Sequence, residues 1–325
     1  MEQLGQHEQE QSMGLRQRPW LRGVVSGMVL IVTLLPLIVY AGFVLRRSPR
    51  TAVERELFQG VAYERQVRNQ PRPLMIHIVT VDLTVPGVEV VVSPGAALAP
   101  AAHNPAVNET AANTTSGFVQ AAQVQVATNG SFFYPFREKT PWDYAPRVGD
   151  RAKVLGQAIA AGEIYAERRD PWQPLCVLPL PDSASQRLVI SPQTTCPVGT
   201  AFALSGGPLL LEQGQPARRE PVGSEHKPYA RLVVAIDQPG TRLWLIAIDG
   251  KQPFYSEGMT LPEVTALAQE LGADRALNLD GGGSTTLVQA TPNQPQLLNA
   301  PVHAKIPMLE RPVANHLGIR ARSHP

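Results

Sequence analysis

Apolar and polar positions along this chain form short patterns that predict β-strands more often than helices. Buried strands are predicted over residues 75–83 and 88–92, and a shorter strand is predicted over 124–127. Residues 231–236 and 243–248 predict a hairpin that closes at a Pro-Gly pair. Because each strand is bounded by Gly, Pro or Asn, the turns between them are expected to be tight.

Only one segment has a clear helical period, residues 261–271. Its apolar face consists of Leu261, Val264, Leu267, Ala268 and Leu271. Thr260 and Glu263 have the spacing of a capping box, and Gly272 is a natural stop. The helix leads into another predicted strand, residues 276–279. Since strands dominate, the predicted fold class is α+β, a mixed β-sheet domain with few helices.

Several predicted strands end in a polar residue followed by glycine. After residues 276–279 come Asp280, the three glycines Gly281, Gly282 and Gly283, and the hydroxyls of Ser284 and Thr285. A carboxylate at the end of a buried strand is costly, and glycines let a ligand approach the backbone closely. This corner therefore predicts a functional site, although a plain hairpin turn is the alternative. Similar corners occur at Asn129-Gly130, Ser205-Gly206-Gly207 and Asp249-Gly250, and we expect them to converge on one pocket.

The chain is long enough, at 325 residues, for one large domain. Its 43% hydrophobic content is that of an ordinary globular protein. The net charge of +2, without a basic patch interleaved with aromatic residues, argues against nucleic-acid binding.

Residues 23–45 are uncharged and apolar, and at roughly 23 residues they are long enough to cross a bilayer. The sequence predicts a cytoplasmic tail over residues 1–22, a transmembrane helix over 23–45 and a stalk over 46–72. Arginines flank the apolar segment on both sides, so charge alone does not set its orientation. A cleaved signal peptide, with secretion of the rest, is the alternative.

Cys176 and Cys196 are the only cysteines. An even number of cysteines beyond a membrane anchor suggests a disulfide that closes a loop of roughly twenty residues. Two unlinked buried thiols are the alternative. A disulfide would place the bulk of the protein outside the cytoplasm.

The corner motifs occur in an order that resembles a known family. In chain order they are Asn129 to Phe133, Leu204 to Pro208, Arg231, Asp249-Gly250, Leu277 to Ser284 and Glu310 to Asn315. Together they resemble the phosphodiester glycosidase domain family, which includes the lysosomal uncovering enzyme and bacterial envelope proteins. The resemblance covers roughly residues 73–322. It implies hydrolysis of a sugar-1-phosphodiester, of the N-acetylglucosamine-1-phosphodiester kind, in envelope or exopolysaccharide glycans.

Cleavage of a glycosyl phosphate builds positive charge on the anomeric carbon, which a carboxylate can stabilise, attack or supply with water. Asp280 is the first candidate, with Asp249 and Glu310 as second carboxylates. Arg231 and Arg311 suit the phosphate charge, and the amides of the three glycines suggest an anion nest. The remaining predicted substrate-binding residues are Asn129, Ser205, Gly206, Gly207, Asn278, Ser284, Thr285 and Asn315.

Two other functions fit the same residues. The first is a module that binds a phosphoglycan without cleaving it. The second is a metal-dependent phosphodiesterase in which Asp280 and Asp249 hold calcium or magnesium. No cofactor is certain from the sequence, although a divalent cation remains an option.

Overall fold

The computed structural model describes residues 19–95, 109–180, 185–217 and 226–324. The chain divides into two units, residues 1–46 and 47–325. The first contains helix α2 (Pro19–Leu45), while residues 1–18 of the predicted tail lie outside the described residues. Among the described residues, no helix has both the length and the apolar character that a membrane span needs. The transmembrane helix predicted over residues 23–45 is therefore not confirmed.

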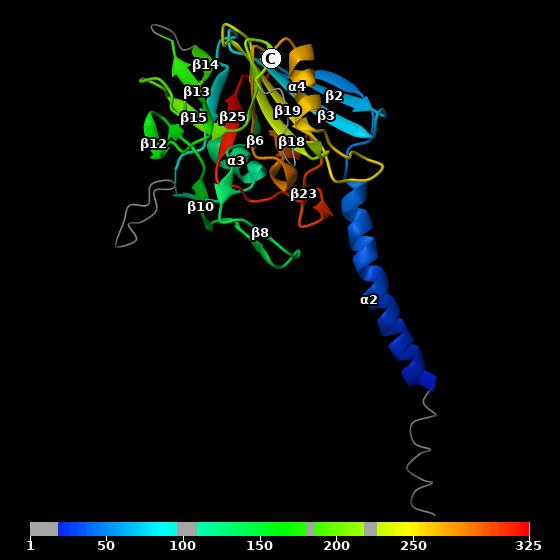
Figure 1. The fold of residues 1–325 in the computed structure, drawn as a ribbon. Helices are drawn as coiled ribbons and strands as arrows, with labels where there is room; N and C mark the ends of the chain where they lie inside the picture. Colours follow the sequence, from blue (N-terminus) through cyan, green and yellow to red (C-terminus); the bar gives the residue numbers. More distant parts are fainter. Residues whose placement is uncertain (1–18, 96–108, 181–184, 218–225, 325) are drawn as a thin grey trace, which may run out of the picture. The chain divides into compact units, whose positions relative to one another are not determined.

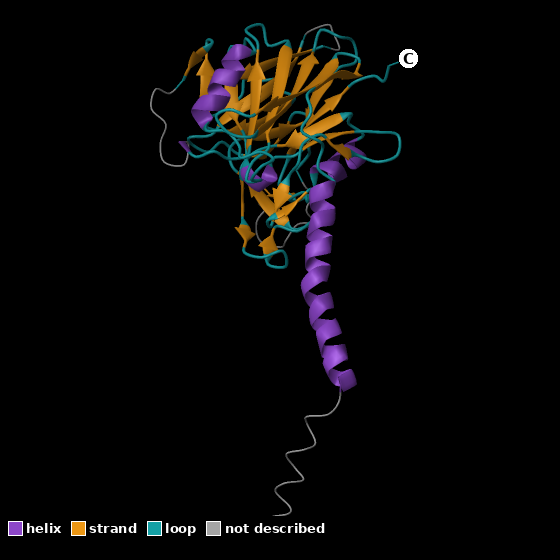
Figure 2. Ribbon diagram, turned by 90° about the vertical axis from the view of Figure 1, so that its right-hand side faces the viewer, coloured by secondary structure: helices purple, strands orange, loops and turns teal. Residues whose placement is uncertain are grey.

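An eight-stranded antiparallel sheet is the centre of the second unit (Figures 1 and 2). Its strand order is β1-β2-β3-β19-β18-β20-β16-β17. The strands are β1 (Val53–Phe58), β2 (Val61–Arg68), β3 (Leu74–Asp82), β16 (Leu209–Glu212), β17 (Gln215–Pro216), β18 (Arg231–Ile236), β19 (Arg242–Ile248) and β20 (Arg275–Asn278). The predicted hairpin is confirmed as β18 and β19, with Arg231 opposite Ile248.

Side chains of this sheet alternate between two cores. On one face Ile76, Ile78 and Trp244 pack against helix α4 (Leu261–Glu270), which covers that face in Figure 1. The predicted capping box is confirmed, since the Glu263 amide donates to Thr260 Oγ1 at 3.3 Å and the Thr260 amide donates to the Glu263 carboxylate at 2.8 Å. The other face packs on two further sheets.

The second sheet has the order β22-β21-β6-β25-β4 and the third has the order β12-β11-β15-β13-β14. The second comprises β4 (Glu89–Val92), β6 (Val126–Asn129), β21 (Leu287–Gln289), β22 (Gln296–Leu297) and β25 (His316–Arg320). The third comprises β11 (Ala158–Ala160), β12 (Glu163–Ala166), β13 (Gln173–Pro179), β14 (Gln186–Ile190) and β15 (Phe202–Gly206). Val79, Leu317 and Leu204, one from each sheet, share a single apolar core.

Smaller elements surround these sheets. Helix α3 (Thr115–Ala122) packs Phe118 and Val119 against the second sheet. The short strands are β5 (Glu109–Ala111), β7 (Phe133–Tyr134), β8 (Arg137–Glu138), β9 (Tyr144–Ala145), β10 (Arg151–Val154), β23 (Val302–His303) and β24 (Ile306–Pro307), and a 3₁₀ turn η2 spans Gly282–Ser284. Cys176 and Cys196 form the predicted disulfide.

Three expectations differ from the structure. Order begins before Leu74, because β1 and β2 lie within the predicted stalk and extend the main sheet. Strand β1 has no fully buried position and β2 has only Val61, Tyr63 and Arg65, so charged residues interrupt both strands and hide the strand pattern. Residues 94–116 are rich in Ala, Asn, Thr and Pro and predict a long surface loop, but strand β5 lies within them and helix α3 begins at their end. All strand pairings in the described part of the chain are antiparallel, so no parallel pair makes the sheet mixed.

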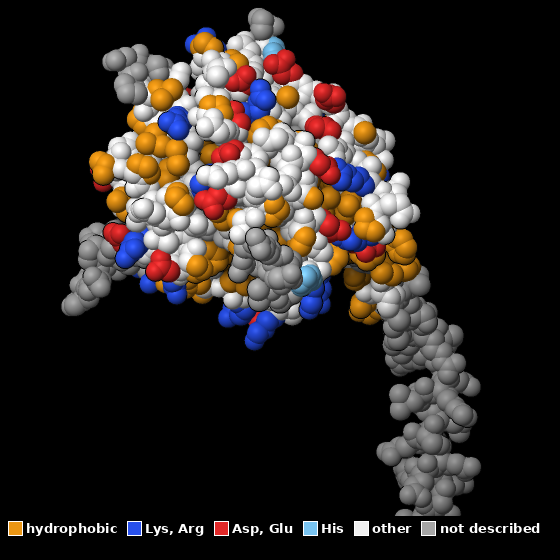
Figure 3. All heavy atoms as spheres, turned by 45° about the horizontal axis from the view of Figure 1, so that its top comes forward, with side chains coloured by type: hydrophobic (Ala, Val, Ile, Leu, Met, Phe, Trp, Pro, Cys, Tyr) orange, Lys and Arg blue, Asp and Glu red, His pale blue; other side chains and the backbone are white. Residues whose placement is uncertain are grey.

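The strand register brings the polar corners to one edge of the molecule. Val233 of β18 lies opposite Asn278, the last residue of β20, and Asp249 follows directly after β19. Asn129 at the end of β6 lies opposite His316 at the start of β25. On the face shown in Figure 3, acidic and basic side chains are interspersed over the upper part of the molecule.

Candidate active site

A cavity of about 780 Å³ opens at this edge. Its walls carry an unusual concentration of cations beside two carboxylates and several aromatic rings. The lining residues are Phe132, Phe133, Phe136, Glu138, Lys227, Tyr229, Arg231, Lys251, Asn278, Asp280, Gly281, Lys305 and Arg311. Of the predicted site residues, the cavity therefore brings together Asp280, Arg231, Asn278, Gly281 and Arg311.

Asp280 is held in place through its backbone. The preceding residue, Leu279, donates its amide to Leu232 O of β18 at 2.8 Å. The Asp280 amide donates to Gly130 O at 3.2 Å, and Asn129 Nδ2 donates to Asp280 O at 2.7 Å. The carboxylate therefore sits where the first and second sheets meet, on a backbone that both sheets fix.

Burial raises the pKa of Asp280 to about 6. The Ser284 hydroxyl, the Arg311 charge and the Gly281 amide each lower this pKa, but together they only partly offset the loss of water. The carboxylate is ionised at neutral pH and is a stronger base than an ordinary aspartate. Such a pKa is typical of a group that exchanges protons during catalysis.

The turn after Asp280 needs glycines for two reasons, the backbone conformation of Gly282 and the close approach of Arg311 to Gly283. Gly282 has a φ of +63°, which other residues rarely adopt. A Cβ at Gly283 would lie 2.3 Å from Arg311 Nη2. The amides are largely engaged, because Gly282 N donates to Ala230 O at 2.8 Å and the Gly281 amide bonds the Asp280 carboxylate. The predicted anion nest is thus mostly occupied by the protein itself.

Arg311 connects the turn to the β8–β9 hairpin. Its Nη1 donates to Ser284 Oγ at 3.0 Å, its Nη2 is paired with the Glu138 carboxylate, and its guanidinium stacks 4.5 Å from the Phe136 ring. Glu138 Oε1 also accepts the Ala304 amide at 2.6 Å. These contacts fix the position of a positive charge that is 7% exposed and faces the cavity.

The other cations are less buried. Arg231 donates to two carbonyls, Met259 O at 3.1 Å and Lys227 O at 3.0 Å, and lies over the Tyr229 ring. Lys251 Nζ lies 4.1 Å from the centre of the same ring. With Lys227 and Lys305, these groups make the rim strongly positive, which suits a negatively charged ligand.

Asn278 offers an unused acceptor. Its Nδ2 donates to Gly207 O at 2.9 Å, and the backbone is tied again by the bond from Gly207 N to Asn278 O at 2.7 Å. Its Oδ1 is buried and has no hydrogen-bond partner in the structure. A ligand hydroxyl that donates to this oxygen would satisfy it.

Asp249 lies outside the cavity lining, in a buried network. Its Oδ1 accepts Asn299 Nδ2 at 3.0 Å and the Ala300 amide at 2.9 Å, and its Oδ2 lies 3.0 Å from His77 Nε2. His77 Nδ1 in turn lies 2.8 Å from the Tyr63 hydroxyl. At 1% exposure, Asp249 connects β19, β3 and the segment before β23.

Glu310 also lies away from the cavity lining. It accepts the Ser116 amide at 2.9 Å and so caps the start of α3, and burial raises its pKa.

The remaining predicted polar residues tie the corners together. Asn315 Oδ1 accepts the Ser131 amide at 2.8 Å. Ser205 donates its amide to Ser131 Oγ at 3.0 Å and its hydroxyl to Gln157 O at 2.8 Å. Thr285 Oγ1 is buried without a partner, and Gly206 packs against Asn278 O. These residues position the site from behind and do not line it.

Sequence reasoning missed several lining residues, namely Glu138, Lys227, Tyr229, Lys251 and Lys305. They come from loops and short hairpins that have no periodic pattern, so only tertiary packing brings them together. The one usable signal was the aromatic pair Phe132-Phe133, which follows the Asn129 corner directly.

The described residues contain no group of three or more His, Cys, Asp or Glu side chains placed to hold a metal ion. Asp249 is one of the two expected metal ligands. Its Oδ1 already accepts two hydrogen bonds, and its Oδ2 lies within hydrogen-bond distance of His77 Nε2.

Comparisons with known proteins agree with this fold. A family model described as phosphodiester glycosidase matches residues 122–320. No curated protein is similar enough to count as a match.

Three solved structures are similar to the chain. One is a hypothetical protein from Synechocystis, with a TM-score of 0.53, 16% identity, 85% coverage of this chain and 64% of that one. Another is the catalytic domain of zebrafish N-acetylglucosamine-1-phosphodiester alpha-N-acetylglucosaminidase auto-inhibited by its pro-peptide, with a TM-score of 0.54, 19% identity and 85% coverage of both chains. A putative exported protein from Burkholderia pseudomallei has a TM-score of 0.53, 14% identity, and 78% and 75% coverage. At these identities the likeness shows the fold alone.

Proposed function

Because the chain belongs to the phosphodiester glycosidase family, we propose that it hydrolyses the glycosidic bond of a sugar-1-phosphodiester. The products are a free sugar and a phosphomonoester on the former partner of that sugar. The observation that carries this proposal is Asp280, a carboxylate whose pKa is raised to about 6 in a cavity lined by cations.

In the proposed reaction, water attacks the anomeric carbon while the bond from that carbon to the phosphate oxygen breaks. The electron pair of this bond leaves with the phosphate, and Asp280 accepts the proton of the attacking water. The Asp280 charge also stabilises positive charge on the anomeric carbon. Its raised pKa makes it a more effective base near neutral pH than an ordinary aspartate.

The leaving phosphate needs its charge stabilised more than it needs a proton. Arg311, whose guanidinium is held by Ser284 and Glu138, supplies a fixed charge, and Arg231 supplies a second. Asn278 Oδ1, the buried acceptor without a partner, is assigned to a sugar hydroxyl. Glu138 is paired with Arg311 and the Ala304 amide, so we assign it the positioning of the arginine and not proton transfer.

Product analysis tests this proposal. The purified chain is incubated with the methyl phosphodiester of N-acetylglucosamine-1-phosphate, and the products are identified by mass spectrometry. We expect free N-acetylglucosamine and methyl phosphate. Asp280→Asn should lose about 10²–10⁴-fold in rate, while Glu270→Gln, which removes an exposed carboxylate at the end of α4, should not.

Other products identify the alternatives. N-acetylglucosamine-1-phosphate would indicate a phosphodiesterase that breaks the P–O bond, and the metal content of the active sample would then show whether a divalent cation takes part. Binding without turnover would indicate a phosphoglycan-binding module. Full activity of Asp280→Asn would refute the assignment of the base.

We propose that the domain works outside the cytoplasm on envelope or exopolysaccharide glycans. The Cys176–Cys196 disulfide supports this location, because disulfides persist in oxidising compartments. The similar Burkholderia protein is described as a putative exported protein. Tethering through residues 23–45 belongs to the same proposal and rests on the sequence pattern alone. Resistance of the domain to external protease in intact cells would contradict this location.

A further inference from the structure

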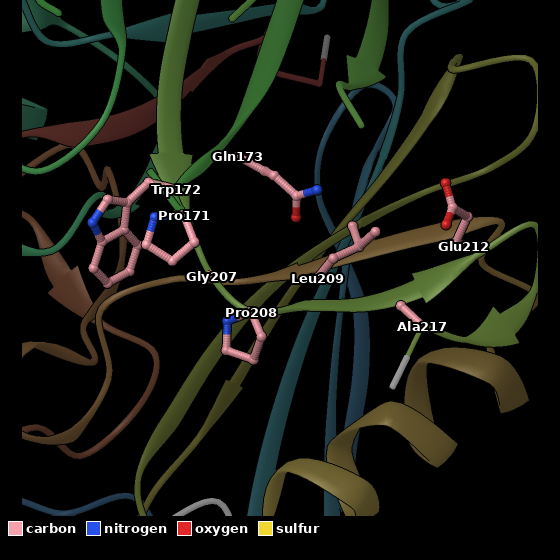
Figure 4. A pocket seen from close by; sticks show the side chains of 8 residues that line it. All are labelled: Pro171, Trp172, Gln173, Gly207, Pro208, Leu209, Glu212 and Ala217. Atoms are coloured by element: carbon pink, nitrogen blue, oxygen red, sulfur yellow. The ribbon is translucent and has the colours of Figure 1, made fainter. Parts of the chain in front are cut away.

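A second cavity, of about 500 Å³, lies beside the first. Figure 4 shows Trp172 and Pro171 together at one end and Glu212 at the other. The lining residues are Pro171, Trp172, Gln173, Gly207, Pro208, Leu209, Glu212 and Ala217. None of them lines the cavity that contains Asp280.

The two cavities share a wall that is one residue layer thick. Trp172 lines the second cavity and Phe132 lines the first, and their ring centres are 4.8 Å apart. Gly207 lines the second cavity and Asn278 lines the first, and hydrogen bonds of 2.7 and 2.9 Å join these two residues. A ligand that extends from the first cavity over this wall therefore meets the second.

The lining of the second cavity is flat and mostly apolar. A Cβ on Gly207 would lie 3.3 Å from Trp172 Cε3, so the glycine lets the indole lie close to the backbone. Pro171, Pro208 and Leu209 add apolar surface to the lining, and Figure 4 shows Pro171 beside the indole. Such a surface suits the apolar face of a pyranose ring, since ligand pockets combine apolar walls with a few polar groups.

The polar groups of this cavity accept hydrogen bonds. Glu212 Oε1 accepts Arg275 Nη2 at 2.8 Å, and Oε2 takes part in no hydrogen bond within the described residues. The amide of Gln173 donates from Nε2 to Pro192 O at 3.2 Å, so Oε1 remains as an acceptor. Among the described residues that line the cavity, Glu212 is the one charged group, and none is a lysine or an arginine. The cavity therefore favours a neutral ligand that donates from hydroxyls and disfavours a phosphate.

We propose that this second cavity binds a neutral pyranose of the glycan attached to the phosphodiester. The idea rests on the proposed function in one respect, that the phosphate of the same substrate occupies the Asp280 cavity. Trp172 stacks on the sugar ring, and Gln173 and Glu212 accept its hydroxyls. The two cavities thus divide the substrate by charge, with the phosphate beside the cations and the uncharged sugar beside Trp172.

Phosphate-free sugars test the cavity without relying on hydrolysis. The full chain is titrated with N,N′-diacetylchitobiose, cellobiose and mannobiose by calorimetry. We expect saturable binding of at least one disaccharide. Trp172→Ala and Gln173→Leu should each weaken it by about tenfold or more, while Asp280→Asn leaves it unchanged. Trp142→Ala is the matched control, because Trp142 is 79% exposed and lines neither cavity.

Binding by none of the three sugars would overturn the proposal, and so would equal binding by wild type, Trp172→Ala and Gln173→Leu. Gln173→Leu keeps the test valid if the loss of Trp172 disturbs Phe132. Kinetics then connect the cavity to the substrate: Gln173→Leu should raise KM for an oligosaccharide-linked phosphodiester and leave turnover of the methyl phosphodiester unaffected. Failure of the proposed function is distinguishable, because it abolishes turnover of the methyl phosphodiester and leaves disaccharide binding intact.

Discussion

Replacing Asp280 by asparagine should stabilise the protein while it removes activity. The carboxylate is ionised in a site that disfavours its charge, and its pKa rises from 3.8 to about 6 on folding. The unfolded state therefore releases this proton more readily than the folded state. Between the two pKa values the folded protein loses stability as the pH rises, and above the folded value the cost is fully present.

The size of the effect follows from the shift. Each unit of pKa corresponds to about 1.4 kcal/mol, so a rise of roughly two units costs the folded state about 3 kcal/mol at pH 8. The shift already includes the favourable contributions of Ser284, Arg311 and the Gly281 amide. Asparagine carries no charge to desolvate, although it loses part of these hydrogen bonds. We expect Asp280→Asn to be more stable than wild type by between about 1 and 3 kcal/mol at pH 8.

Urea unfolding at several pH values measures this difference. The advantage of Asp280→Asn should be largest at pH 8, shrink through pH 6 and 5, and be lost only below about pH 3, where the wild-type carboxyl is protonated in both states. Glu270→Gln serves as the control, since its carboxylate is exposed. A variant that is less stable than wild type at pH 8, or a difference that does not change with pH, would refute the reasoning.

Four further predictions concern the same machinery and its supports. The value of kcat/KM should fall about tenfold per pH unit below pH 6, because protonation removes the Asp280 base; a profile that is flat down to pH 5 would contradict this. Arg311→Lys keeps the positive charge but loses the guanidinium that contacts both Ser284 and Glu138. The value of kcat/KM should therefore drop about 10- to 100-fold, with little change in the urea midpoint of unfolding. Asp249→Ala leaves three buried donors without their acceptor and should lower the free energy of unfolding by about 3–5 kcal/mol, as measured by urea denaturation. Replacing Cys176 and Cys196 together by serine should cost about 3 kcal/mol by the same assay, from the loop of twenty residues that they close.

The predictable part of the fold was its interior. Strands β3, β18, β19 and β20 are buried on both faces, so they read as continuous apolar runs, and the Thr260–Glu263 box marks the start of α4. Strands β1 and β2 were missed because runs of charged residues interrupt them, as they do in a solvated stalk.

The site was predictable only where its chemistry is local. The Asp280 turn contains its carboxylate, glycines and hydroxyls within a few positions, so a site at this corner could be predicted from spacing. Lys227, Lys251 and Lys305 reach the cavity from separate loops, and no short-range signal relates them. A dipeptide such as Asp249-Gly250 gives no indication of whether its carboxylate lines a cavity or anchors a buried network.

The turn that carries Asp280 is bonded to two separate sheets, and one of its partners lies next to a residue that is bonded to the third. Leu279 is tied to β18, Asp280 to the residue after β6, and the adjoining Ser131 to Ser205 in β15. These partners are far apart along the chain, so each bond closes a long loop and none forms early in folding. Catalytic geometry is therefore gained only at the end of tertiary assembly. A partly folded chain therefore has the Asp280 turn in its sequence but not the assembled cavity around it.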